Sequence, residues 1–161
     1  MNAPKLKEVE AFFFTAMLKG WVSQGEKGSF SDMPGYEIGV DYMDDGFRLL
    51  DIYCTTSLSV RSAGTTTIWY QDVPVWFMSY GGEYAKESIP FLKQALFATY
   101  SKREFVGGRG SDRILSSNDT MIYMNQPVSY HFSQFRGHEK IVRITDGVTL
   151  GWHDYQGLSL F

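Results

Sequence analysis

The apolar positions near the start of the chain recur at helical spacing. They are Leu6, Val9, Phe13, Ala16 and Met17. This spacing places them on one side of a helix, and the following Gly20 is a natural stop. The pattern therefore predicts an amphipathic helix over residues 5–19.

A similar pattern returns in the middle of the chain, at residues 88–101. Ser88 is a candidate N-cap, and Pro90 is tolerated in the first helical turn because its missing N–H has no partner there. The expected buried face consists of Phe91, Leu92, Ala95 and Leu96. This segment predicts a second helix.

After each predicted helix the chain changes to β-rich runs separated by turn signals. Runs 36–42 and 47–55 surround Asp44-Asp45-Gly46, and runs 65–71 and 75–80 follow a candidate short strand at 57–62. In the second half the runs are 121–124, 128–135, 138–145 and 148–155, with a turn expected at 125–127. Residues 23–35 are predicted to be a loop, and Gly107–Ser111 a flexible linker.

One hairpin-like stretch, residues 64–82, has a degenerate copy at residues 137–157. The offset is 73 between the leading glycines, Gly64 and Gly137 (137 − 64), and 75 between Tyr80 and Tyr155 (155 − 80). A fixed internal period implies two structural halves, here about 5–82 and about 86–161 of a single domain, 1–161.

Two helix-plus-meander halves would each expose an apolar sheet face if they stayed apart. We therefore predict an α+β fold in which the halves form one curved antiparallel sheet with both helices packed on it. A ligand site is expected at the junction of the halves, because pockets favour such interfaces.

Composition narrows the functional classes. Of 161 residues, 43% are hydrophobic and 20% charged, and the net charge is −3, so the chain is expected to fold by itself and not to bind nucleic acid directly. No apolar run approaches the ~20 residues of a membrane span. The single Cys54 and the absence of a signal-like start favour a cytoplasmic protein. No cofactor is expected.

Four motifs in order resemble a bacterial and archaeal family of unknown function, found alone or behind an Xre-type helix-turn-helix. The motifs are Gly46-Phe-x-x-x-Asp51-x-Tyr53, then Gly64-x-x-x-Ile68 with Pro74-Val-Trp76-x-Met78-x-Tyr80-x-Gly82, then Phe91-Leu92-x-x-Ala95-Leu96, and last Phe135-Arg-Gly137-x-Glu139-x-Ile141.

The resemblance implies no activity, because the family has none to transfer. This chain has Thr66 and Ser79 where the family pattern has Glu and Asn, and threonines at 55 and 56 where a glycine is usual. If those positions bind a ligand in relatives, the first-half site is altered here. No helix-turn-helix pattern is found, so no DNA-linked role is carried over.

Candidate chemistry is concentrated on strand positions that share a face. Asp51 and Tyr53 are two residues apart, so they share one side of a strand. The two side chains could bind a cation or act as an acid/base pair, or they could form a hydrogen bond that is only structural. The two hairpins add further aromatic and polar groups. The candidate ligand-binding residues are Asp51, Tyr53, Trp76, Met78, Tyr80, Glu139, His153 and Tyr155.

The residue spacing gives less support to a metal site or to a catalytic nucleophile. His138 and Glu139 are neighbours on a strand and point to opposite faces, and a zinc site from His131, His153 and a carboxylate has no supporting spacing. No Gly-x-Ser-x-Gly elbow or cysteine–histidine pattern is present, so no catalytic residue is assigned.

Three functional hypotheses remain. The leading one is a non-catalytic small-ligand-binding or regulatory domain. The second is a small enzyme that uses Asp51, Glu139 or His153 as an acid or base in a Tyr/Trp-lined cleft. The third is a protein–protein interaction module, which pairs through an exposed strand edge or forms a homodimer through an aromatic patch.

The Asp146-Gly147 turn supports a prediction on stability. Glycine accepts the positive φ of an Asp-Gly turn, so we expect Gly147→Val to destabilise the fold by roughly 1 to 3 kcal/mol and to promote aggregation. Val73→Ala, in the other hairpin, should be much milder. Thermal melts of both variants check this, and the reverse order would contradict the paired-hairpin alignment.

Overall fold

The computed structural model describes residues 3–22 and 33–161, and within them the chain forms two α-helices and eight strands. The predicted 23–35 loop therefore falls mostly outside the described residues. The helices are α1 (Leu6–Val22) and α2 (Ile89–Ser101), the latter preceded by the 3-10 turn η1 (Lys86–Ser88). None of the described helices has the length and apolarity to cross a bilayer.

All eight strands belong to a single antiparallel sheet. They are β1 (Tyr36–Asp44), β2 (Phe47–Thr55), β3 (Arg61–Tyr70), β4 (Val73–Tyr84), β5 (Arg113–Leu115), β6 (Met121–His131), β7 (Gln134–Arg143) and β8 (Thr149–Ser159). Their order is β1-β2-β3-β4-β8-β7-β6-β5. The predicted α+β fold, with two helices on one antiparallel sheet, is confirmed.

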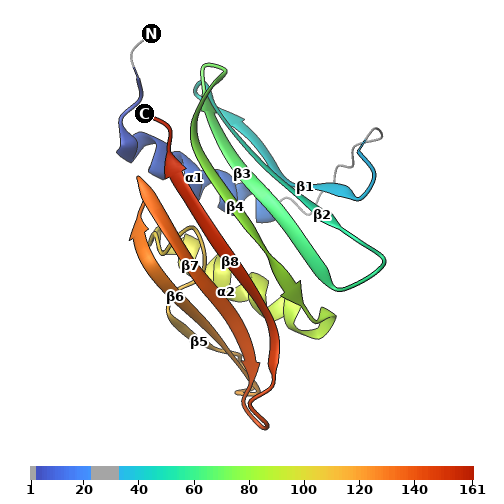
Figure 1. Cartoon of the computed structure of the whole chain (residues 1–161). Helices are drawn as coiled ribbons and strands as arrows, with labels where there is room; N and C mark the ends of the chain where they lie inside the picture. The colour runs from blue at the N-terminus through green and yellow to red at the C-terminus, as the bar shows by residue number, and fades with distance from the viewer. Residues whose placement is uncertain (1–2, 23–32) are drawn as a thin grey trace.

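The two four-stranded meanders meet at β4 and β8 in the middle of the sheet (Figure 1). In this central ladder Tyr80 lies directly opposite Tyr155. Both helices cover the same face, which we call the inner face, and the other face is the outer face (Figure 1). Along β8 the inner positions are Gly151, His153, Tyr155 and Gly157, all of which are buried.

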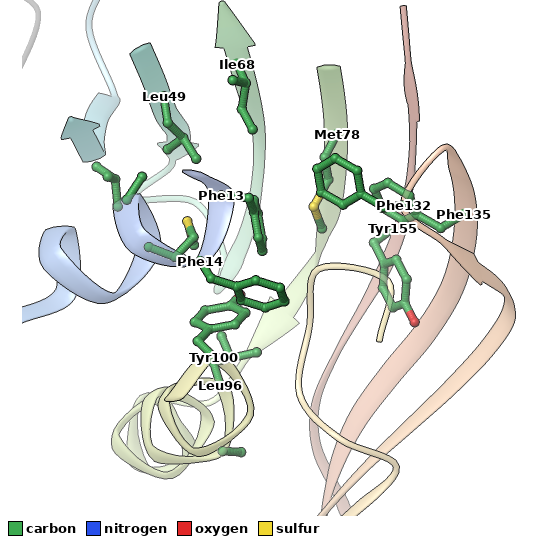
Figure 2. Packing of buried hydrophobic residues seen from close by; sticks show 14 of the residues in the cluster. Phe13, Phe14, Leu49, Ile68, Met78, Leu96, Tyr100, Phe132, Phe135 and Tyr155 are labelled. Carbon is green, nitrogen blue, oxygen red and sulfur yellow. The ribbon is translucent and has the colours of Figure 1, made fainter. Parts of the chain in front are cut away.

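The hydrophobic core fills the space between the inner face and the helices. Figure 2 shows Phe13 and Phe14 of α1 beside Tyr100 of α2, and the Phe13 and Tyr100 rings meet edge-on at 5.9 Å. Trp76 of β4 stacks on Phe132 at 5.1 Å and donates its indole N–H to the Phe132 carbonyl. Aromatic rings therefore join the two helices and both meanders.

The hairpin turns differ from the sequence expectation. Gln71 and Asp72 have φ of 49° and 64°, so the β3–β4 turn uses two left-handed residues without glycine. Gly147 does have a positive φ, 72°, but it lies in the longer connection 144–148 and not in a two-residue turn. The loss of stability expected for Gly147→Val therefore depends on the φ angle alone, because no atom lies within 4 Å of the position of an added Cβ.

Three local predictions are wrong. The expected turn at 125–127 lies inside β6, where a bulge at Pro127 bends the strand without ending it. The candidate strand at 57–62 is not separate, because β3 begins at Arg61. The run 128–135 is not one strand, because it spans the end of β6 and the start of β7. Ser88 does occupy the predicted N-cap position of α2, but its hydroxyl donates to the carbonyls of Ala85 and Leu150, which ties the helix start to β8.

Candidate functional site

A layer of buried polar side chains lies on the inner face where the two meanders meet. The strands β2, β3 and β4 contribute Asp51, Thr66 and Tyr84 together with the half-buried Tyr80, and the strands β6, β7 and β8 contribute Tyr123, Asn125, Glu139, His153 and Tyr155. These residues are alternate positions of their strands, so they all face the helices. The same alternation placed several of them on one face in the sequence.

The connection between α2 and β5 closes over this layer. Gly107, Gly108 and Gly110 are buried, and the Asn125 amide donates to the carbonyls of Val106 (3.0 Å) and Gly110 (2.7 Å). The Tyr100 hydroxyl donates to the Gly108 carbonyl at 2.7 Å. We call residues 106–110 the glycine loop. The prediction of a flexible linker is wrong here, because the loop is packed and hydrogen-bonded.

Glycine is required in this loop for space. A Cβ added at Gly107 would lie 2.4 Å from the Tyr155 ring, and one added at Gly110 would lie 2.5 Å from the Tyr123 ring. Gly107 and Gly108 also have φ of 67° and 69°, which side chains rarely adopt. The glycines therefore let the loop backbone lie directly against the tyrosines and place Arg109 inside the protein.

Arg109 and Glu139 form an ion pair at the centre of the layer. The Glu139 side chain is 0% exposed and Arg109 is 7% exposed. Arg109 Nη2 donates to Glu139 Oε1, the Tyr84 hydroxyl donates to the same oxygen at 3.2 Å, and the Tyr123 hydroxyl donates to Oε2. Both carboxylate oxygens of Glu139 are thus satisfied, as a buried charge requires.

The surroundings of Glu139 favour its ionised form. Burial alone would raise the pKa of this carboxyl group, but the Arg109 charge and the hydrogen bonds from Arg109 and His153 outweigh it and lower the pKa to about 2. Glu139 is therefore a carboxylate at neutral pH, and Arg109 is its counter-ion.

His153 lies beside this pair and between two tyrosines. Its Nδ1 is 3.4 Å from Arg109 Nη2 and 3.5 Å from Glu139 Oε1. The Tyr84 ring meets the imidazole edge-on at 4.9 Å, and the Tyr80 ring lies at 5.6 Å. Burial lowers the pKa of His153, an effect that Glu139 partly offsets, so the imidazole is neutral at pH 7.

Asp51 forms a second, smaller cluster on the first-half side. It accepts hydrogen bonds from the Thr66 hydroxyl at 2.6 Å and from the Tyr80 hydroxyl at 3.1 Å. Burial raises the pKa of Asp51, and these hydrogen bonds only reduce the rise. Arg109 lies over the Tyr80 ring, 5.4 Å from its centroid, and so connects the two carboxyl groups.

The paired central tyrosines depend on glycines in the neighbouring strands. A Cβ at Gly64 would lie 2.6 Å from the Tyr80 ring, and one at Gly137 would lie 2.3 Å from the Tyr155 hydroxyl. Tyr155 instead extends over Gly137 and donates to Asn125 at 2.6 Å. The Gly-x-x-x-Ile pattern of both hairpins thus makes room for a tyrosine of the next strand.

Two nitrogen atoms in this layer have no hydrogen-bond partner. They are Arg109 Nε and His153 Nε2, and both are shielded from solvent. Every other buried side-chain nitrogen and oxygen in the described part of the chain is paired. Such exceptions are rare in folded proteins and call for an explanation.

The structure brings together five of the eight predicted ligand-binding residues: Asp51, Tyr80, Glu139, His153 and Tyr155. Trp76 and Met78 instead belong to the hydrophobic core, and Tyr53 donates to Glu37 at 2.6 Å. His131, which was considered together with His153 as a zinc ligand, is exposed at the end of β6, whereas His153 is buried. Within residues 3–22 and 33–161 no group of three potential metal ligands was found.

Sequence reasoning missed Arg109, Tyr84, Tyr123 and Asn125. Tyr84 lies four positions from Tyr80 on the same strand, so period-two alternation carried a usable signal for it. Asn125 had no such signal, because it falls in the turn expected at 125–127. Arg109 had only one signal, an arginine enclosed by glycines in a short segment.

Comparison with known proteins gives one match. The sequence model of a family described as "Domain of unknown function (DUF5680)" matches residues 51–157, more than half of the chain. The matched segment begins at Asp51 and includes Arg109, Glu139 and His153. No curated protein and no solved structure matches the chain.

The Arg109–Glu139 pair leads to a prediction on stability. Glu139→Gln leaves the guanidinium buried without a counter-ion, and we expect a loss of about 3 to 5 kcal/mol in the free energy of unfolding, measured by urea denaturation. The matched control is Asp51→Asn, whose amide oxygen still accepts from Thr66 and Tyr80, so its loss should be smaller. Equal losses would show that the ion pair is not the dominant contact.

A second prediction concerns acid. Because the folded-state pKa of Glu139, about 2, lies below its ordinary value of 4.5, its stabilising contribution is complete above pH ~4.5 and is lost as the pH falls toward 2. The unfolding free energy of the parent protein should fall across this window. In Glu139→Gln this component should disappear, and an unchanged acid profile in that variant would assign the loss to other carboxyl groups.

Proposed function

The chain belongs to the DUF5680 family of domains of unknown function, and on the evidence of its own buried site we propose that it is a non-catalytic domain that binds a small uncharged polar molecule. The proposed binding groups are Arg109 and His153, with Glu139 as the charge that holds Arg109 in place. The glycine loop is proposed to be the cover of the site.

The two unpartnered nitrogens carry this proposal. A buried polar atom without a hydrogen bond costs roughly 1 to 3 kcal/mol, so Arg109 Nε and His153 Nε2 together make the closed site unfavourable by a few kcal/mol. A polar molecule that hydrogen-bonds to both atoms would remove this cost. The two nitrogens therefore support a ligand with at least two hydrogen-bonding atoms.

The charge balance supports an uncharged ligand. Glu139 and Arg109 compensate each other inside the protein, and His153 is neutral. A ligand with a net charge would be buried without a counter-ion, which is far more costly than the burial of a hydroxyl or an amide. The neighbouring rings of Tyr80 and Tyr84 suit the apolar part of such a molecule.

We also propose that the two halves of the domain are an internal repeat in which the second half kept the charged site. The support is that each half has one helix before four strands and that Tyr80 lies opposite Tyr155. Glu139 follows Gly137 by two residues, as Thr66 follows Gly64. A threonine in place of the glutamate leaves the first half with Asp51 as its buried carboxyl group.

An enzyme is the second candidate, and one observation favours it. The environments of Asp51 and Glu139 move their pKa values in opposite directions, upward for Asp51 and downward for Glu139. Pairs of carboxyl groups separated in this way provide a general acid and a general base in some active sites. The near-complete burial of both groups makes this the weaker candidate, because a substrate has to reach them.

A thermal-shift screen of uncharged metabolites, with charged analogues of matched size, tests the binding proposal. We expect at least one uncharged compound to raise the melting temperature in a saturable way, by the linkage of ligand binding to folding. His153→Phe keeps a ring between Tyr80 and Tyr84 but removes the nitrogen, so this shift should be lost. In the control His138→Phe, on the outer face, it should persist.

Two results would contradict the proposal. One is that no compound stabilises the parent protein more than His153→Phe. The other is that a stabilising compound is consumed at a rate that Asp51→Asn reduces, which would identify the domain as an enzyme. The nitrogen resonances of the His153 imidazole in the parent protein give a second measurement, because a ligand bound at Nε2 must change them. This measurement does not depend on whether His153→Phe folds.

A further inference from the structure

The outer face of the sheet carries a shallow, open groove. It is lined by Glu83 of β4, Trp152 and Asp154 of β8, His138 and Lys140 of β7, and Val60 from the β2–β3 connection. Trp152 and the buried His153 are neighbours on β8 and point to opposite faces. The groove is therefore distinct from the buried site.

Trp152 is the centre of this groove. In the ladders it lies directly opposite Glu83 on one side and Lys140 on the other. Because neighbouring strands are about 4.8 Å apart, a carboxylate and an ammonium group bracket the indole over a span of roughly 10 Å. The His138 ring stacks beside the indole, with its centroid 5.9 Å away and its plane tilted by 22°.

The polar groups of the groove have hydrogen-bonding capacity to spare. Among the described residues, neither the Trp152 indole N–H nor the Lys140 ammonium group has a hydrogen-bond partner. His138 contacts Asp154 at 2.8 Å and Arg61 contacts Glu83 at 3.3 Å, but all four side chains are well exposed. Exposed pairs of this kind are weak and exchange partners easily.

The charges of the groove balance. Among the lining residues Glu83 and Asp154 are negative and Lys140 is positive. Arg61 lies outside the lining but pairs with Glu83, and so supplies the second positive charge. An anion such as a phosphate would face two carboxylates, and a purely apolar ligand would cover charged groups without satisfying them. The groove therefore suits an uncharged molecule with one flat apolar face and a rim of hydroxyl groups.

We infer that the outer-face groove binds a neutral saccharide, with one sugar ring stacked on Trp152 between Glu83 and Lys140. The C–H face of the ring covers the indole, as amphipathic aromatic residues permit. Sugar hydroxyls donate to the carboxylates of Glu83 and Asp154 and accept from Lys140 and from the indole N–H. A single ring with its hydroxyls fits the span between the flanking strands.

Nuclear magnetic resonance of the indole N–H groups tests this inference on the full chain. The protein has four tryptophans, and Trp152→Phe identifies the Trp152 signal by its loss. Neutral hexopyranoses and their disaccharides are titrated, with glucuronate and inorganic phosphate as charged comparisons. We expect at least one neutral sugar to shift the Trp152 signal in a saturable way, and the charged compounds to leave it in place.

A pair of tryptophan variants then tests whether the sugar stacks on the Trp152 indole. Trp152→Ala should weaken sugar binding about tenfold, a change of ~1.4 kcal/mol, as followed by the backbone amide signals of Lys140 and Asp154. The control is Trp69→Ala on β3, which removes another half-buried tryptophan away from the groove. Its affinity should equal that of the parent protein.

The inference is overturned if no neutral sugar moves the Trp152 signal, if the charged compounds move it more, or if Trp152→Ala binds as tightly as the parent. None of these results depends on the buried site. His153→Phe should leave sugar binding unchanged, so the two proposals fail or succeed separately.

Discussion

The ion pair between Arg109 and Glu139 is the contact on which the arrangement of the polar layer depends. A charge buried without its partner costs several kcal/mol, a large part of the 5 to 15 kcal/mol that typically stabilises a domain. Glu139 is fixed in the middle of β7, so Arg109 has to reach it from the α2–β5 connection. The glycine loop therefore has one favourable position, directly over the junction of the two meanders.

This constraint explains several glycines together. The loop reaches the sheet only because Gly107 and Gly110 leave room for the rings of Tyr155 and Tyr123. Tyr155 also extends over Gly137, and Tyr80 over the first-half counterpart Gly64, because neither glycine carries a side chain. Tyrosine and glycine positions on different elements are thus matched in pairs, and each tyrosine hydroxyl then reaches a buried acceptor such as Glu139 or Asn125.

The two faces of the sheet differ in their chemistry. The inner face combines the hydrophobic core with the buried polar layer at the junction, and this layer leaves two nitrogens without partners. The outer face remains open and presents Trp152 among charged side chains of both signs. Strand alternation separates the two sites by a single residue, so that His153 faces the buried layer while Trp152 faces solvent.

Much of the architecture could be predicted from the sequence because it depends on local patterns. Apolar spacing located α1 and α2 to within a few residues, and the β-rich runs overlap seven of the eight strands. The β6–β7 boundary was wrong, because the turn was expected at 125–127 and the chain turns at 132–133. Alternation also placed Tyr80, Glu139 and His153 correctly on strands. The short β5, Arg113–Leu115, has too few residues for a pattern to be recognised.

The tertiary structure alone decided which of these residues form a site. Arg109 meets Glu139 across 30 positions of sequence, and its burial results from α2, β7 and β8 closing around it. A charged side chain in a glycine-rich segment looks solvent-exposed when only its neighbours in sequence are considered. Whether a charge is buried, and which pKa its partner then has, depends on the surrounding low-dielectric medium, and that medium exists only once distant segments have packed together.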